Sequence, residues 1–323
     1  MAENKFMWSH LVHLGWNCWN EFGVTKEREH RSTPSGTHTL LFDRPLWDAH
    51  MQELRDIGIN TLIVDVADAM RFESHPEIAI DDSWTHYEMK KEVEKLKAMG
   101  FEVIPKLNFS AGHDVWLKDY SHMLCTDIYR EVCRDLIDEV CEVFKPNHFH
   151  LGMDEETAVN QRNQDYVVIR RGNFWWRDFY HLVESVERNN CSAWIWSDRV
   201  LEYEEEFFAK MPTSVVQNNW YYWGCFKEGD PEFNEKRQQH INTFYRMDKL
   251  GYKQVPAGSI FFTEDNFEKL TKFALENISS ENLMGMMQTV WERIDKDWMH
   301  VHKTALDNYR KTIKLYGERI DKR

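Results

Sequence analysis

The chain alternates short apolar runs with longer amphipathic segments. The apolar runs have the length of buried β-strands, and in the segments between them apolar side chains recur at helical spacing, as at Trp47, Met51 and Leu54. The pattern predicts eight strands, each followed by a helix. The predicted strands cover residues 11–16, 60–66, 101–109, 148–152, 192–196, 214–220, 252–259 and 283–291.

Eight strand–helix units in 323 residues predict an α/β fold, a single-domain (β/α)8 TIM barrel that spans residues 1–323. No Pro/Gly/Ser-rich linker divides the chain. An open doubly wound sheet is the alternative. No G-x-G-x-x-G motif follows the first apolar run, which removes the usual reason to prefer that alternative.

The charge of the chain limits its partners. A net charge of −14 argues against nucleic acid, because phosphate binding needs clustered Lys and Arg. No apolar stretch approaches the roughly 20 residues that cross a bilayer, so we expect no membrane partner. The N-terminal "MAENKFMWSHLVHLGW" lacks the features of an export signal. As written, the chain is expected to be cytoplasmic, whereas a longer native N-terminus would allow a periplasmic or secreted protein. The sequence specifies no oligomeric state.

Carboxylates, amides and aromatic rings follow the predicted strands. In a (β/α)8 barrel the catalytic side chains lie at these carboxyl-terminal strand ends. The polar and aromatic residues there are Trp16, Asn17, Asp65, Asp68, Asn108, His113, Asp154, Glu155, Trp196, Asp198, Asn218, Asn219, Trp220, Tyr221, Tyr222, Trp291 and Glu292. Flat aromatic faces suit the apolar face of a sugar ring, and the chain has 14 Trp. This set predicts a carbohydrate ligand.

The adjacent acids Asp154 and Glu155 favour one kind of glycoside cleavage. Two carboxyl groups usually stand about 5 Å or more apart across the sugar, which is awkward for neighbours in sequence. Adjacent acids suit substrate assistance, in which the 2-acetamido oxygen of the sugar attacks the anomeric carbon. One acid then protonates the leaving group and the other orients the acetamide N–H. Close carboxylates also push their pKa values apart, which keeps one of them protonated.

Several segments resemble one known family. "HLGMDE" (150–155) resembles the H-x-G-G-D-E signature of family 20 glycoside hydrolases, the β-N-acetylhexosaminidases. "NTLIVDVADAMRFESHPEI" (60–78) and "GFEVIPKLNFSAGH" (100–113) are similar to upstream segments of that family. "WIWSD", "VVQNNWYY" and "TVWER" stand where the family has pocket tryptophans, a tyrosine and a final Glu. The resemblance covers about residues 60–300.

The resemblance implies a retaining exo-glycosidase that releases a terminal N-acetylhexosamine by substrate-assisted catalysis, without a cofactor. Glu155 would be the general acid/base and Asp154 the carboxylate that polarises the acetamide. Tyr222 or Tyr221 would bind the acetamide oxygen. The other substrate-binding residues would be Trp196, Trp220, Trp291, Glu292, Asn219, Asp198 and Trp16. The residues that orient the acids would be His113, Asp68 and His150.

Departures from the family pattern keep other functions open. Met153 stands where the signature has its second glycine, and Asn108 and Ala111 replace an acid and a proline of the third-strand segment. The family's arginine at the end of the first strand is absent from "HLGWNCWNEF", and Glu292 follows Trp291 directly. The alternatives are a non-catalytic carbohydrate-binding barrel and a glycosidase with a different sugar specificity.

A metal-dependent hydrolase is a further alternative. His148, His150 and Asp154 carry ligand types that bind Zn²⁺, and alternate residues of a strand point the same way. Such barrels use further histidines at later strand ends, and "WIWSD" and "VVQNNW" contain none. We therefore predict no metal, and we expect His148 to be a core histidine. Glu156, the third acid of the triplet, is expected to be a solvated loop residue.

Overall fold

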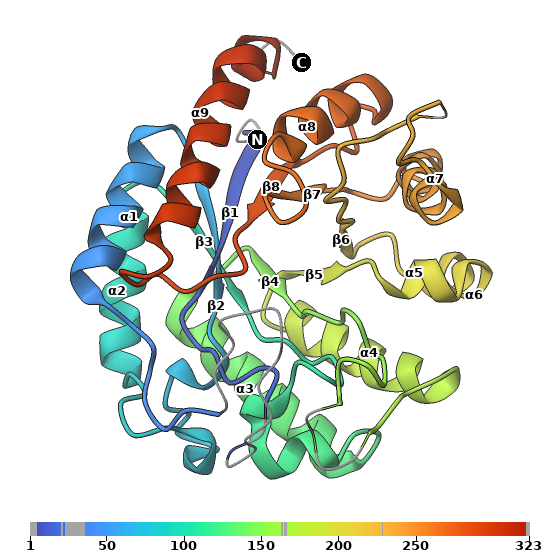
Figure 1. Cartoon of the computed structure of the whole chain (residues 1–323). Coiled ribbons are helices and arrows are strands. Elements are labelled where there is room, and N and C mark those ends of the chain that lie inside the picture. The colour runs from blue at the N-terminus through green and yellow to red at the C-terminus, as the bar shows by residue number, and fades with distance from the viewer. Residues whose placement is uncertain are drawn as a thin grey trace. The chain divides into compact units, whose positions relative to one another are not determined.

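Eight parallel strands alternate with helices in a (β/α)8 barrel, as the apolar pattern predicts (Figure 1). The computed structural model describes residues 5–20, 22, 36–162, 164, 167–227 and 229–320. The strand order is β6-β5-β4-β3-β2-β1-β8-β7. The chain divides into two compact units. The Asp154 unit comprises residues 13–43 and 63–195, and the His10 unit comprises residues 1–12, 44–62 and 196–323.

The Asp154 unit holds the third, fourth and fifth strands and the helices that follow the second to fourth strands. Its strands are β3 (Glu102–Lys106), β4 (His148–His150) and most of β5 (Ser192–Trp196). Its helices are α2 (His86–Ala98), α3 (Asp127–Phe144) and α4 (Asn173–Glu187), with 3-10 turns at Ala67–Ala69, Pro76–Ile78 and Val115–His122. β4 pairs in parallel with both neighbours, with His150 opposite Lys106 on β3 and Trp194 on β5.

The His10 unit holds the first strand and the last three. Its strands are β1 (Met7–His13, whose last residue belongs to the other unit), β6 (Val216–Asn218), β7 (Ala257–Ser259) and β8 (Gly285–Thr289). Its helices are α1 (Arg44–Asp56), α5 (Arg199–Glu202), α6 (Glu204–Lys210), α7 (Glu235–Lys249), α8 (Asn266–Asn277) and α9 (Met299–Ile320). β2 (Thr61–Asp65) contributes residues to both units.

Six of the observed strands are shorter than predicted, β5 has the predicted bounds, and β1 is longer by one residue and begins earlier. β1 starts at Met7 and ends at His13, whereas the sequence predicts residues 11–16. The amides of Leu14 and Gly15 both donate to the carbonyl oxygen of Asp65, at 2.9 and 3.1 Å, and this shared acceptor ends the regular ladder. Trp16 therefore lies in the loop after the strand, where a binding residue of a barrel is expected.

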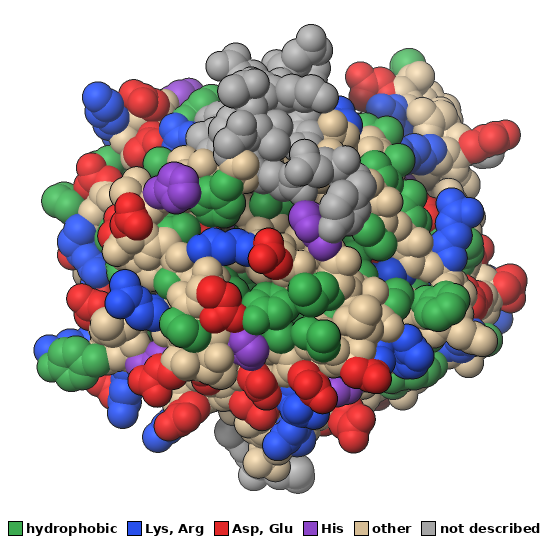
Figure 2. Space-filling view, turned by 90° about the horizontal axis from the view of Figure 1, so that it is seen from below, with side chains coloured by type: hydrophobic (Ala, Val, Ile, Leu, Met, Phe, Trp, Pro, Cys, Tyr) green, Lys and Arg blue, Asp and Glu red, His purple; other side chains and the backbone are tan. Residues whose placement is uncertain are grey.

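The described surface mixes side chains of both charges. None of the described helices is long and apolar enough to cross a membrane. On the face shown in Figure 2, the acidic side chains of the described residues are interspersed with Lys and Arg. No basic patch of the kind that binds phosphate is visible among the described residues on this face.

Candidate active site

The loop that follows β4 has an unusual backbone. Gly152, Met153 and Glu155 all have positive φ, at 72°, 74° and 49°. A Cβ atom on Gly152 would lie 2.0 Å from Oδ1 of Asn108, so only glycine fits there. Met153 replaces the second glycine of the family signature yet adopts the left-handed conformation, at a cost of about 1–2 kcal/mol. The loop keeps a path that glycine would follow freely, and such strain is concentrated at functional sites.

Asp154 is buried and held by two side chains from the third-strand segment. Asn108 Nδ2 donates to its Oδ1 at 2.8 Å, and His113 Nδ1 lies 3.2 Å from its Oδ2. Oδ1 of Asn108 accepts from the amides of Ser110, at 3.1 Å, and Met153, at 3.3 Å. These bonds fix the Asn108 amide with its NH₂ group toward Asp154. The asparagine that replaces a family acid thus orients a carboxylate instead of repelling it.

The charges around Asp154 keep it ionised. Burial alone would raise the pKa of Asp154, but His113, Lys106 and Asn108 outweigh it and hold the pKa well below its ordinary range. Burial alone would lower the pKa of His113, but Asp154 and then Glu155 raise it. Asp154 and His113 therefore each favour the charged form of the other. This is the ionisation state that the resemblance requires of Asp154.

Glu155 differs from Asp154 in being open to solvent. Its side chain is 48% exposed, and its Oε2 lies 3.8 Å from Nε2 of His113 and accepts from Asn160 Nδ2 at 3.2 Å. His113 therefore contacts both acids, through one ring nitrogen each. The two neighbouring carboxylates have unlike surroundings, one buried and one exposed, which suits two unlike roles in one reaction.

A buried ion cluster near these acids was not predicted. Lys106 Nζ lies 2.5 Å from Asp65 Oδ2, and His13 Nδ1 lies 3.1 Å from the same oxygen. Burial alone would lower the pKa of Lys106, but Asp65 and then Asp154 raise it. The sequence signal for this cluster was one basic residue inside each of two apolar runs, Lys106 in "VIPKLNF" and His13 in "LVHLGW". The positive charge of Lys106 therefore also acts on Asp154 and helps to lower its pKa.

Asp68 bonds to Asn17 rather than to the acids. Asn17 Nδ2 donates to Asp68 Oδ2 at 2.6 Å, and Oδ1 of Asn17 accepts from the amide of Thr37 at 2.8 Å. Within the described residues, Asp68 makes no bond to Asp154 or Glu155, so its predicted role of orienting the acid is not supported. Burial raises the pKa of Asp68 to about 7, against the lowering effect of the Asn17 bond.

The raised pKa of Asp68 predicts a pH-dependent effect of Asp68→Asn. The folded protein keeps a proton that the unfolded chain, with a pKa of about 3.9, has lost. The native protein therefore loses stability as pH rises from about 4 to about 7, and the variant does not. Urea unfolding should show Asp68→Asn gaining on the native protein over this range. The exposed control Asp119→Asn should show no such trend, and a pH-independent Asp68→Asn difference would contradict the assignment.

Trp16 packs within an aromatic cluster. Its ring centroid lies 4.8 Å from that of His13 and 5.4 Å from that of Trp19, and the Trp19 ring meets His113 edge-on at 6.0 Å. Trp16 and Trp19 are both buried. Trp16 was predicted to bind substrate, and the structure gives it a packing role beside the ion cluster. Trp19, which the sequence did not single out, connects this cluster to His113.

The two histidines of β4 make different contacts. His150 is buried, and its Nδ1 accepts from the amide of Gly152 at 3.0 Å, so it supports the strained loop. His148 Nδ1 lies 2.9 Å from Glu102 Oε1. Among the described residues, neither His148 nor His150 belongs to a group of three potential metal ligands. The structure therefore gives no support to a metal centre built on His148, His150 and Asp154.

Glu156 is not a solvated loop residue, contrary to the prediction. Its carboxylate is only 7% exposed and forms an ion pair with Arg170, whose guanidinium is fully buried. Arg170 also donates to the carbonyl oxygen of Phe109 at 2.7 Å and lies 3.3 Å from Asp178 Oδ2. Arg170 thus joins the loop after β4 to the segment after β3 and to α4.

Aromatic residues follow the fifth, sixth and eighth strands in the His10 unit. Trp196 is buried, and its ring centroid lies 6.0 Å from that of the half-buried Trp291. Trp220 is also half-buried; its Nε1 donates to Asp198 Oδ1 at 3.0 Å, and its ring lies 5.0 Å from that of Tyr222. These contacts form two groups, Trp196 with Trp291, and Trp220 with Asp198 and Tyr222. All five residues were predicted to bind substrate.

The remaining predicted residues of the His10 unit differ in what they can offer a ligand. Tyr221 is fully buried, and its hydroxyl proton is donated to the carbonyl oxygen of Cys225. Tyr222 Oη accepts from Thr289 Oγ1 at 3.3 Å. Asn219 is buried and donates to Thr243 Oγ1 on α7 at 2.6 Å. Glu292 is half-buried.

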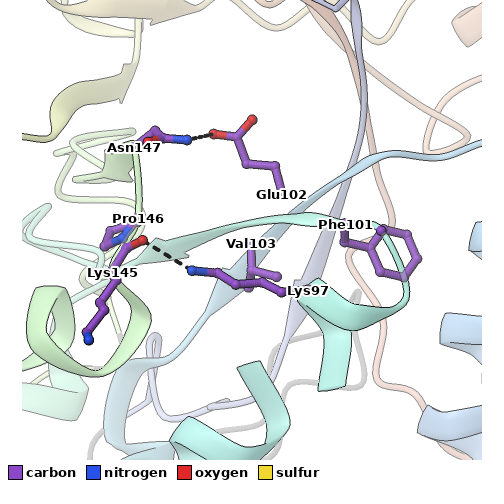
Figure 3. A pocket seen from close by; sticks show the side chains of 8 residues that line it. Lys97, Phe101, Glu102, Val103, Lys145, Pro146 and Asn147 are labelled. Carbon is purple, nitrogen blue, oxygen red and sulfur yellow. Dashed lines mark hydrogen bonds between the residues drawn. The ribbon is translucent and has the colours of Figure 1, made fainter. Parts of the chain in front are cut away.

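A pocket of about 340 Å³ lies at the amino-terminal ends of β3 and β4 (Figure 3). It is lined by Lys97, Gly100, Phe101, Glu102, Val103, Lys145, Pro146 and Asn147. The Lys97 ammonium group donates to the carbonyl oxygens of Phe144, at 2.6 Å, and Lys145, at 3.1 Å, at the end of α3. Because barrel enzymes place their chemistry at the carboxyl ends of the strands, this pocket is not a candidate active site.

Comparison with known proteins identifies solved structures of the same fold. No family model matches the chain. A β-N-acetylhexosaminidase from Bacteroides fragilis superposes with a TM-score of 0.62 over 98% of this chain and 69% of its own, at 13% identity. A family 20 β-N-acetylhexosaminidase from Streptomyces coelicolor gives 0.63 over 94% of this chain and 63% of its own, at 10% identity. The chain has the fold of family 20 glycoside hydrolases.

One curated sequence adds local similarity. A lacto-N-biosidase from Bifidobacterium bifidum is 27% identical in a 124-residue alignment that covers 33% of this chain and 11% of that protein. The chain thus spans about a tenth of the curated relative.

Within the family 20 fold, "HLGMDE" stands at the carboxyl end of β4, which is the active rim of a barrel. Fold and motif therefore agree on the position of Asp154 and Glu155.

Proposed function

We propose that the protein is a glycoside hydrolase that releases a terminal N-acetylhexosamine with retention of configuration, by substrate-assisted catalysis. The observation that carries the proposal is the pair at the end of β4. Asp154 is buried, ionised and fixed by Asn108 and His113, while the adjacent Glu155 is open to solvent. Substrate assistance needs one carboxylate that stays charged and a second acid that exchanges protons with the leaving group and with water.

In the proposed reaction, Glu155 protonates the glycosidic oxygen while the acetamide oxygen of the sugar attacks the anomeric carbon. The C1–O bond to the leaving group breaks, and a cyclic oxazolinium ion forms on the same sugar. The Asp154 carboxylate accepts a hydrogen bond from the acetamide N–H and stabilises the positive charge that develops there. A water molecule, deprotonated by Glu155, then attacks the anomeric carbon and opens the ring. Two inversions give net retention.

The aromatic residues of the His10 unit have proposed roles as well. Tyr222 would donate a hydrogen bond to the acetamide oxygen, and Trp196, Trp220 and Trp291 would contact the apolar faces of the sugar. These roles rest on the family resemblance and on the position of each residue after its own strand. Asp198, which accepts from Trp220 Nε1, orients that indole.

A substrate panel tests the proposal. We expect hydrolysis of 4-nitrophenyl N-acetyl-β-D-glucosaminide or the corresponding galactosaminide. The matched glucoside and galactoside lack the acetamide nucleophile and should react at least about 100-fold more slowly, because the internal attack is lost. Comparable rates on the 2-hydroxyl sugars would contradict substrate assistance while leaving a glycosidase of different specificity.

A non-catalytic carbohydrate-binding barrel is the second candidate. The observation that favours it is the loop after β1, which holds the buried, packed Trp16 and lacks the arginine that the family resemblance implies at the end of the first strand. This candidate predicts that N-acetylglucosamine or N-acetylgalactosamine raises the thermal unfolding midpoint while no glycoside of the panel is hydrolysed. Turnover on any member of the panel that is abolished by Glu155→Gln would eliminate it.

A further inference from the structure

Three histidines from three separate elements of the His10 unit meet in the interior. His10 lies on β1, His50 on α1 and His302 on α9, and all three are buried. One ring nitrogen from each lies within 4.8 Å of the others. Among the described residues, this is the one group of three potential metal-ligating side chains. In Figure 1, α9 runs beside β1, and a bond from Tyr309 Oη on α9 to the carbonyl oxygen of Ser9 on β1 joins them at 2.5 Å.

The hydrogen bonds of Tyr309 fix the tautomer of His10. Tyr309 Oη donates its single proton to Ser9 and accepts from the amide of Gln288 at 3.1 Å. It lies 3.3 Å from Nδ1 of His10 and can therefore only accept from that nitrogen. In the neutral ring of His10, Nδ1 then carries the proton and Nε2 carries the lone pair. The lone pair is on the nitrogen that faces His50.

The tautomer of His302 is fixed in the same way. Its Nε2 lies 3.1 Å from the carbonyl oxygen of Arg293, which can only accept a hydrogen bond. The lone pair of the neutral ring is therefore on Nδ1. Metal-binding histidines typically donate their second ring N–H to a carbonyl, carboxylate or similar acceptor, which orients the ring and strengthens the ligand. His10 and His302 both have this arrangement.

The nitrogens of His10 and His50 have the spacing of two ligands on one ion. Nε2 of His10 and Nε2 of His50 are 3.4 Å apart. Two nitrogens that lie 2.0–2.1 Å from a tetrahedral Zn²⁺ are separated by about 3.3–3.4 Å.

We propose that His10, His50 and His302 bind a divalent transition-metal ion, Zn²⁺ in the first instance, that ties α1 and α9 to β1. Imidazole nitrogens without carboxylates or thiolates select ions of this class over Mg²⁺ and Ca²⁺. Because none of the three belongs to the residues assigned to the sugar reaction, the site is proposed as a structural metal centre. Its existence does not depend on the proposed activity.

Metal analysis of the full chain, produced without a histidine tag, tests the proposal. We expect one equivalent of Zn²⁺ per chain after incubation with Zn²⁺ and removal of the excess. X-ray absorption at the zinc edge should show nitrogen or oxygen neighbours at about 2.0–2.1 Å and no sulfur at about 2.3 Å. Sulfur neighbours would assign the ion to the cysteines and overturn the proposal, as would the absence of binding.

Single substitutions give a second test. His50→Gln and His302→Gln should each weaken Zn²⁺ binding by more than about 100-fold. Tyr309→Phe, which keeps all three ligands but removes the hydroxyl that bonds to His10, Ser9 and Gln288, should weaken it by about 10–100-fold. His148→Gln, a histidine outside the cluster, should bind Zn²⁺ as the native protein does. Unchanged binding in both cluster variants would overturn the proposal. If those variants do not fold, Tyr309→Phe and the absorption spectrum of the native protein decide the question.

Discussion

Glu155→Gln is expected to lower kcat/KM for an N-acetylhexosaminide by about 10²–10⁴-fold, the range that general acid–base catalysis contributes. The amide keeps the size of the side chain but cannot protonate the leaving group. Glu155 has the freedom this role requires, because its side chain is 48% exposed and its partners are Asn160 and, at 3.8 Å, His113. Rates on substrates with different leaving groups, measured at saturating concentration, provide the readout.

The leaving group distinguishes loss of the acid from general damage. Nitrophenolate departs without much protonation, so the loss should be smallest for the nitrophenyl substrate and largest for a disaccharide. Glu131→Gln, an exposed glutamate on α3, is the matched control and should retain native rates. An equal loss on all substrates would indicate misfolding or misplacement, and native rates in Glu155→Gln would contradict its assignment as the acid.

Asp154→Asn should lower the rate on every substrate by a similar factor, about 10²–10³-fold, because the developing positive charge loses its carboxylate whatever the leaving group. The substitution also removes the nearer of the two carboxylates that His113 contacts. The two variants should therefore differ in their dependence on the leaving group, which a purely structural role of the loop would not produce.

Arg170→Met is expected to lower the free energy of unfolding by about 3–5 kcal/mol, the cost of removing one partner from a buried ion pair. The guanidinium is fully buried between Glu156 and Asp178 and also donates to the carbonyl oxygen of Phe109. Without it, two buried carboxylates lie near each other with less compensation. Urea unfolding at pH 7 gives the measurement, and Arg162→Met, an exposed arginine without a charged partner among the described residues, should change stability by less than about 0.5 kcal/mol.

The partners of Arg170 sharpen this prediction. Arg170→Lys should also destabilise the protein, because an ammonium group cannot reproduce the contacts of the planar guanidinium with Glu156, Asp178 and the Phe109 carbonyl oxygen. The triple variant Arg170→Met/Glu156→Gln/Asp178→Asn should recover part of the loss, because neither carboxylate that faced Arg170 remains charged, although Arg130 then keeps only Asp127 as an ion-pair partner. A single Arg170→Met variant as stable as the native protein would show that Glu156 is solvated after all.

The sequence predicted the features that depend on local pattern. Apolar runs placed the eight strands to within a few residues, and the barrel rule then placed Asp154 and Glu155 at an active rim. The unlike surroundings of the two acids depend on Asn108, which lies 46 residues before Asp154, and on His113. The family segment pointed to His113 but not to the orientation of the Asn108 amide.

Features that depend on contacts between distant residues could not be predicted. Glu156 was expected to be solvated because its partner, Arg170, lies in a loop with no regular pattern. The histidines 10, 50 and 302 meet only once β1, α1 and α9 are folded together, and no motif links their positions. The buried pair of Lys106 and Asp65 has the same origin, because charged residues inside apolar runs acquire meaning only when both strands are in place.

Binding of N-acetylglucosamine-thiazoline, a mimic of the oxazolinium intermediate, tests the central claim most directly. Structures of the native protein with this compound should show the thiazoline nitrogen within hydrogen-bond distance, about 2.7–3.0 Å, of a carboxylate oxygen of Asp154. Calorimetry should show binding to the native protein that Asp154→Asn weakens by at least about 10-fold. Failure of the native protein to bind the compound, or binding with Asp154 turned away from its nitrogen, would contradict the substrate-assisted mechanism.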